Sequence, residues 1–204
     1  MTNMENKEVQ VVEQPKNQWR EVVETYLANT NTKLSPSELK EFVMLCKAHN
    51  LNPIKREIYA VKYGNKFNVI TNYYEYLKRA DATGLLEYSN VEMVDGENGV
   101  PVKAIFIGKR KDQSKELRME FYFNEWNSGQ STWLTKPHFM LDKCAIANGL
   151  RRLFPNELAN MPYVNEELWY WNKQNEEIVN EHIAIEEKDK KEVPNMELVM
   201  GENE

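Results

Sequence analysis

The chain has 204 residues, 41% of them apolar, which is enough for one sizeable domain with a packed core. Its formal net charge is −6, but residues 51–155 carry 16 Lys and Arg against 12 Asp and Glu, whereas residues 156–204 carry 4 against 13. No run approaches the ~18 apolar residues of a membrane span, and the polar start lacks a secretory signal, so we expect no membrane partner. The basic middle stays compatible with nucleic acid, because binding follows the local charge.

Residues 1–34 are predicted to form an N-terminal arm that contains one short helix. Residues 1–15 are polar and expected to be disordered, whereas residues 17–28 repeat apolar side chains at helical spacing. We expect this helix to expose Trp19 and Tyr26 on a segment loosely tied to the core, which favours a contact with a neighbouring subunit. Docking on the chain's own core is the alternative.

The core, residues 35–165, is predicted to begin with a helix whose two ends are marked in the sequence. Ser35 and Glu38 form a capping box around Pro36, which is a favoured first helical residue. Asn50 can take the left-handed conformation that ends a helix. Apolar residues recur between these ends at helical spacing, and this indicates a packing role.

A β-hairpin is predicted directly after Pro53, because two β-branched and aromatic runs flank a Gly-Asn turn. Lys55 and Arg56 would lie at the mouth of this hairpin, and Lys62 and Lys66 near its tip. The plain interpretation of these four cations is a solvated rim.

One helix, three strands and a loop are predicted after the hairpin. Asn72 can cap a helix over 72–83, whose tyrosines favour a half-buried face, with base stacking as the alternative. The remaining segments are read as strands at 86–94, 102–108 and 117–123, followed by a loop with two tryptophans at 124–135.

Pro137 is predicted to open the longest helix of the core, which closes at Pro155. Its small residues, Gly149 among them, permit close approach of another backbone. Residues 166–187 are predicted to form an acidic helix, and residues 188–204 a disordered acidic tail. The predicted fold class is therefore α+β, with a short antiparallel sheet and hairpins flanked by helices, and with residues 166–204 outside the core.

Catalytic and metal-binding motifs are sparse in this sequence. It has no phosphate-binding P-loop, no G-x-S-x-G elbow and no acidic cluster in the basic segment of the kind that a two-metal nuclease requires. Cys46, His49, His138 and Cys144 could supply zinc ligands, but their spacing is poor, and two buried reduced thiols are the favoured interpretation. We predict no catalytic residues and no metal site.

Two segments carry a resemblance to a known family: LNPIKREIYA at 51–60 and TWLTKPHFMLDKCAIANGLRRLFPNEL at 132–158. Together they resemble the RecT and Bet family of phage single-strand annealing proteins. Arg56, Lys111 and Arg151 match basic positions of that family. His138 stands where phage Bet has a lysine, and Cys144 stands at another such position, with Lys143 adjacent.

The resemblance implies ATP-independent binding of single-stranded DNA and annealing of complementary strands in phage-type homologous recombination, without enzymatic chemistry. It implies a homo-oligomeric ring or helical filament in the bacterial cytoplasm, no required cofactor, and Mg²⁺ only as a counterion. Further partners would be the annealed duplex, a phage exonuclease and a host single-strand binding protein. The alternatives are a plain single-stranded DNA-binding protein and a metal-dependent nuclease. The predicted DNA-binding residues are Lys55, Arg56, Lys62, Lys66, Lys111, Lys136, His138, Lys143, Arg151 and Arg152.

Overall fold

A computed structural model describes residues 18–30, 32–63, 66–129, 132–170 and 173 of the chain. Its elements follow one another in the order α1 (Gln18–Thr30), α2 (Pro36–His49), β1 (Ile58–Tyr63), β2 (Lys66–Thr71), α3 (Tyr73–Ala82), β3 (Leu86–Asp95), β4 (Pro101–Arg110), β5 (Leu117–Tyr122), α4 (Phe123–Trp126), α5 (Thr132–Thr135), α6 (Pro137–Leu153), α7 (Pro155–Leu158) and the short 3₁₀ helix η1 (Asn165–Glu167). The predicted α+β class is confirmed.

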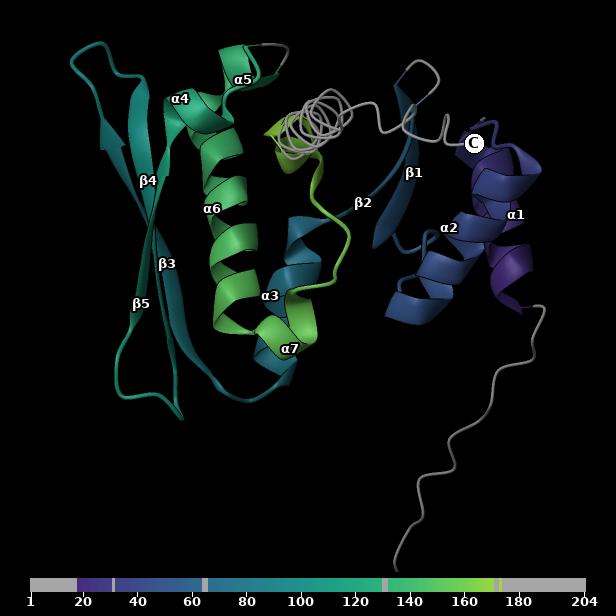
Figure 1. Ribbon diagram of the computed structural model, residues 1–204, viewed down its shortest axis with the longest axis horizontal. Coiled ribbons are helices and arrows are strands. Elements are labelled where there is room, and N and C mark those ends of the chain that lie inside the picture. The colour runs from purple at the N-terminus through teal and green to yellow at the C-terminus, as the bar shows by residue number, and fades with distance from the viewer. Residues whose placement is uncertain (1–17, 31, 64–65, 130–131, 171–172, 174–204) are drawn as a thin grey trace, which may run out of the picture.

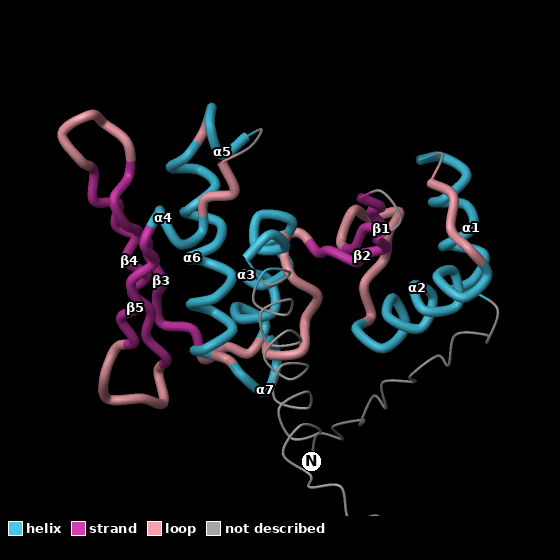
Figure 2. Tube along the Cα trace, turned by 45° about the horizontal axis from the view of Figure 1, so that its top comes forward, coloured by secondary structure: helices cyan, strands magenta, loops and turns pink. Residues whose placement is uncertain are grey.

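The elements form successive layers across the long axis of the molecule (Figure 1). The sheet β3-β4-β5 lies at one side and α6 packs on it, followed by α3 and α7. The separate hairpin β1-β2 comes next, and α2 and α1 close the far side (Figure 2). The single predicted sheet is thus two sheets, with α3 running directly from the hairpin to the larger one.

Alternation along β4 explains how the larger sheet meets α6. Phe106 pairs with Val91 on β3 and with Met119 on β5, and these side chains face the helix. Residues of the opposite parity, including Ile105 and Ile107, lie on the outer face, which no described helix covers. Both are nevertheless buried, and their partners on the neighbouring strands are long polar side chains, Glu92 and Glu120 for Ile105 and Asn90 and Arg118 for Ile107.

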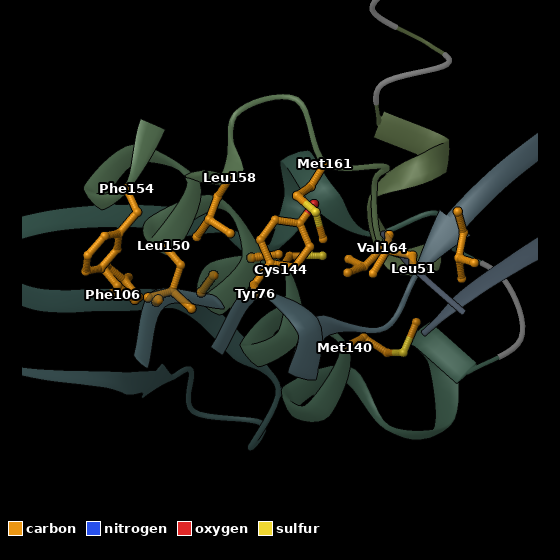
Figure 3. Packing of buried hydrophobic residues seen from close by; sticks show 14 of the residues in the cluster. Leu51, Tyr76, Phe106, Met140, Cys144, Leu150, Phe154, Leu158, Met161 and Val164 are labelled. Carbon is orange, nitrogen blue, oxygen red and sulfur yellow. The ribbon is translucent and has the colours of Figure 1, made fainter. Parts of the chain in front are cut away.

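Phe106 fixes the separation between the sheet and α6. A Cβ atom placed on Gly149 would lie 2.2 Å from Cγ of Phe106, so the aromatic ring rests directly on the helix backbone. The small residues of this helix are predicted to permit close approach of another backbone, but at Gly149 the element that approaches is the Phe106 side chain. Figure 3 shows Phe106 beside Leu150 and Phe154, at one end of the buried cluster that continues through Tyr76 and Cys144.

The hairpin β1-β2 packs on the N-terminal helices α1 and α2. Ile58 and Ala60 are buried there, and the rings of Tyr26 and Phe42 lie 5.9 Å apart. The expectation that Tyr26 is exposed is wrong, because only 7% of its surface is accessible, whereas Trp19 is half-buried. Within the chain, α1 docks on α2, and a contact of this helix with a neighbouring subunit stays a prediction.

Local signals in the sequence set the helix ends. Ser35 and Glu38 form the predicted capping box, Asn50 ends α2 in the left-handed conformation with φ 48°, and the Asn72 side chain accepts a hydrogen bond from the N–H of Tyr74. The predicted loop at 124–135 is wrong, since α4 and α5 form there. Burial of Trp126 and Trp133 drives this local folding, as both rings pack on aromatic neighbours.

Both cysteines, Cys46 and Cys144, are buried free thiols, as predicted. Among the described residues, no helix has the length and apolar character needed to cross a bilayer. The predictions for residues 1–15 and 188–204, and for most of the acidic helix at 166–187, lie outside the described part of the chain.

Candidate nucleic-acid interface

The turn between α2 and β1 is tightly constrained and presents cations to solvent. The Asn52 side chain accepts hydrogen bonds from the N–H groups of Ile54 at 2.9 Å and Lys55 at 3.3 Å. The Glu57 carboxylate accepts from the N–H of Asn52 at 2.8 Å. These bonds close the turn from within, so Lys55 and its neighbour Arg56 project outward and are exposed. No hydrogen bond or ion pair to a described residue holds either side chain.

Arg56 adopts a backbone conformation that L-residues rarely use. Its φ is +61°, in the left-handed region, which costs a non-glycine residue ~1–2 kcal/mol. Strained backbone of this kind persists where the surroundings over-determine it, and it concentrates at functional sites. The turn thus holds a charged side chain at a position where glycine would relieve strain.

A groove lies between the hairpin and α6, at the N-terminus of α3, and we call it the central groove. Its volume is about 320 Å³, and it is lined by Tyr59, Ile70, Thr71, Asn72, Tyr73, Tyr74, Phe139, Lys143, Asn165 and Glu166. The turn that carries Arg56 adjoins this groove, because the backbone carbonyl of Glu57 accepts a hydrogen bond of 2.6 Å from the Thr71 hydroxyl.

The tyrosines of α3 divide between packing and exposure. Tyr76 is fully buried, as the packing interpretation predicts, but 55% of Tyr74 is accessible. The rings of Tyr73 and Tyr74 lie 4.1 Å apart in the central groove. Opposite them, the Lys143 ammonium lies 4.2 Å from the ring centroid of Phe139 and 5.7 Å from that of Tyr73. The groove therefore combines aromatic faces with one lysine.

A carboxylate from the segment after α7 neutralises that lysine. Lys143 Nζ lies 2.6 Å from Glu166 Oε1, and both side chains are largely buried. Because the charges cancel, the floor of the central groove is close to neutral. Exposed cations adjoin lining residues along the chain: Arg56 precedes Glu57, which bonds Thr71, and Lys136 precedes Phe139 by three residues.

Arg151 lies inside a buried network. Its guanidinium donates to Glu167 at 3.1 and 3.3 Å, to the Asn148 side-chain oxygen at 3.2 Å, and to the Tyr76 hydroxyl. It also lies 4.9 Å from the ring centroids of Tyr76 and Tyr163. The Arg151 side chain is only 13% exposed and that of Glu167 is not exposed, so this arginine joins α6 to α3 and η1.

Within this network, burial and the neighbouring charges shift the pKa values of Arg151 and Glu167 in opposite directions. Burial alone lowers the pKa of Arg151, but Glu167 and Tyr76 outweigh it, so the guanidinium stays charged. Burial raises the pKa of the Glu167 carboxyl, although Arg151 opposes this shift. The ion pair therefore ties η1 to α6, and loss of either partner would leave a buried charge uncompensated.

The other predicted cations are dispersed. Lys62 pairs with Glu38 at 2.8 Å, His138 with Asp95 at 2.7 Å, and Lys111 donates to the Gly84 carbonyl at 2.9 Å. Lys66 is exposed on the hairpin, and Arg152 is exposed on the last turn of α6. Lys136 and Arg152 lie at opposite ends of α6, roughly 24 Å apart at ~1.5 Å per residue. The ten predicted residues are thus not gathered in the central groove, and DNA contact by each of them stays a prediction.

Sequence reasoning missed the two acidic partners of α6, Glu166 and Glu167. Consecutive glutamates followed by Leu168 and Trp169 offered a weak signal, because apolar residues beside acids in a tail indicate docking. Among the described residues, no group of three or more His, Cys, Asp and Glu side chains is placed to hold a metal ion.

Comparison with known proteins identifies the family of the chain. The model of the RecT family matches residues 13–185, a range that includes the turn, the central groove and all of α6. The chain is also 30% identical over 139 residues to the Uncharacterized protein UU154 of Ureaplasma parvum serovar 3. That alignment covers 65% of this chain and 61% of the Ureaplasma protein, so the chain spans less than two thirds of that relative's length.

Proposed function

Because the chain belongs to the RecT family, we propose that it binds single-stranded DNA and anneals complementary strands without ATP, in phage-type recombination. The observation that carries the proposal is the rigid turn that presents Lys55 and Arg56 beside the central groove. Exposed cations held on fixed backbone can follow phosphates without reading sequence. Binding of this kind leaves the Watson–Crick edges of the bases accessible to a second strand.

The mechanism needs charge neutralisation and alignment. The cations at the margins of the groove offset the repulsion between two phosphate backbones. Base pairing then tests the second strand, and duplex stacking supplies the driving force. No covalent bond changes, so the proposal includes neither a catalytic residue nor a cofactor, and Mg²⁺ would act only as a counterion. Assembly into a ring or filament and contacts with an exonuclease or a host single-strand binding protein belong to the same proposal.

An annealing assay with two complementary oligonucleotides, without ATP, tests this function. The protein should accelerate duplex formation over the spontaneous rate, and Arg56→Ala should weaken binding to all single-strand sequences alike. The salt slope of the affinity should fall by about 0.7 for the lost phosphate contact. Arg118→Ala is the matched control, because Arg118 is an exposed arginine on the outer face of the sheet, 3.5 Å from Glu92.

The results separate this function from its alternatives. Binding without faster annealing would indicate a plain single-stranded DNA-binding protein, and cleavage in the presence of Mg²⁺ would indicate a nuclease. An affinity and salt slope unchanged by Arg56→Ala would remove the turn from the interface. The phosphate contacts predicted for Arg151 and Lys143 stay predictions, and in this structure both side chains are held by glutamates.

A further inference from the structure

Two aromatic side chains that line the central groove are exposed to solvent. Tyr74 is 55% accessible and Phe139 is 47% accessible, although other aromatic side chains of the chain, such as Trp126 and Trp133, are almost fully buried. Tyr74 comes from the first turn of α3 and Phe139 from the first turn of α6. Both helices therefore present an aromatic face to the same opening.

The size and charge of the groove restrict its occupant. A volume of about 320 Å³ lies at the lower end of small-molecule sites, so the groove suits one planar ring rather than a helix or a strand. An anion would gain little there, because the Lys143 ammonium is already paired with Glu166 at 2.6 Å. An uncharged ring with a polar edge fits better, since its face can stack and its edge can meet the Lys143–Glu166 pair.

The surroundings place phosphate-binding groups on both sides of such a ring. Lys136 precedes Phe139 by three residues and is exposed. On the other side, Glu57 joins the turn of Lys55 and Arg56 to Thr71 at the groove wall. A neutral aromatic site between two cationic margins matches the repeat of a single strand, in which charged phosphates alternate with uncharged bases.

We propose that the central groove takes one nucleobase of the bound strand, which stacks on Tyr74 and Phe139 while its flanking phosphates lie near Arg56 and Lys136. This inference rests on the proposed function and specifies how the strand is held. Stacking tolerates any sequence, because every base has an aromatic face. Lys143 and Glu166 then contact the polar edge of this one base, while the neighbouring bases keep their Watson–Crick edges free for the second strand. Lys143 thus differs in role from the phosphate-binding cations.

The experiment measures the affinity of Tyr74→Ala and Phe139→Ala for a fluorescently labelled oligonucleotide over a series of salt concentrations. Loss of a base–aromatic stack should weaken binding about tenfold, within the ~1–3 kcal/mol known for such contacts, and leave the salt slope unchanged. Tyr88→Ala is the matched control, because Tyr88 is 40% accessible on the outer face of the sheet. It should bind as wild type does. Thermal unfolding of each variant checks that the fold is retained.

A second measurement tests the base directly. Wild-type protein should prefer an ordinary strand to an abasic strand with the same phosphates, and the double variant Tyr74→Ala/Phe139→Ala should lose most of that preference. If wild type binds DNA and both aromatic variants match Tyr88→Ala, the inference is wrong while the proposed function stands. If wild type does not bind single-stranded DNA, the proposed function fails and the inference fails with it.

Discussion

Arg56 combines a strained backbone with an exposed charged side chain, which we propose binds phosphate. Its left-handed backbone is held by the internal hydrogen bonds of the turn, and its side chain makes no bond to a described residue that would compensate. Selection for folding alone would favour glycine at this position. The charge of Arg56 at this strained position is what our proposal explains, because a phosphate contact would offset the cost of the strain.

Arg56→Gly should therefore separate stability from binding. Relief of ~1–2 kcal/mol of strain, less the ~0.5–1 kcal/mol that glycine loses in chain entropy, should leave the free energy of unfolding equal to wild type or up to ~1.5 kcal/mol higher. DNA affinity should fall as it does for Arg56→Ala. Arg56→Ala keeps a Cβ and should show no gain in stability. Chemical denaturation measures the free energy of unfolding, and DNA titration measures the affinity. A clear loss of stability in Arg56→Gly would show that the left-handed backbone of Arg56 is not strained.

At the scale of elements, α6 is the element around which the others are placed. One face rests on Phe106 of the sheet, a second holds η1 through Arg151 and Glu167, and its N-terminal turn supplies Phe139 to the central groove. A shift of this helix would alter all three contacts. Its position depends on the absence of a side chain at Gly149.

Gly149→Ala should destabilise the protein by about 1–2 kcal/mol. The added methyl would lie 2.2 Å from Cγ of Phe106. We therefore expect a cost in the upper half of the ~1–3 kcal/mol range for overpacking, about 2–3 kcal/mol, less the ~1 kcal/mol gained in helix propensity. Gly96→Ala is the control, because its nearest new contacts are at 3.4 Å, and its stability should change by less than ~0.5 kcal/mol. Thermal unfolding of the two variants provides the comparison. Equal midpoints would show that α6 can move away from the sheet freely.

The elements were more predictable from sequence than the site. The capping box at Ser35, the left-handed Asn50 and the alternation in β5 are local patterns, so neighbouring residues reveal them. The environment of Arg151 is not local, because its partner Glu167 is 16 positions away and approaches only after α7 reverses the chain. A cation in a sequence carries the same charge whether it faces solvent or a buried carboxylate, and only the fold distinguishes the two.

At the scale of the whole molecule, one buried cluster joins the N-terminal lobe, formed by α1, α2 and the hairpin β1-β2, to the remaining elements. Val23 and Phe42 beside the hairpin belong to the same cluster as Phe106 and Leu150 between α6 and the sheet. Thr71 strengthens this connection, since its N–H donates to the Tyr163 carbonyl at 3.0 Å. A contiguous core predicts that the described part of the chain unfolds as one unit.

The two thiols provide a measurement of this cooperativity. Cys46 lies in α2 and Cys144 in α6, and burial raises the pKa of Cys46 to about 12 and the pKa of Cys144 well above its ordinary value. Neither thiol should react with iodoacetamide at pH 8 in the native state, because the thiolate is the reactive form. Under increasing denaturant both should become labelled in parallel. Labelling of Cys46 at a lower concentration would show that the N-terminal lobe opens alone.

The contact between Phe106 and Gly149 also has an evolutionary consequence. A chain that gains a methyl group at position 149 must lose volume at position 106, or else move α6 away from the sheet. The two positions should therefore change together among relatives, with a residue larger than glycine tolerated only opposite a residue smaller than phenylalanine. Such paired substitutions would show from sequences alone that the spacing between the helix and the sheet is kept, even where overall identity is low.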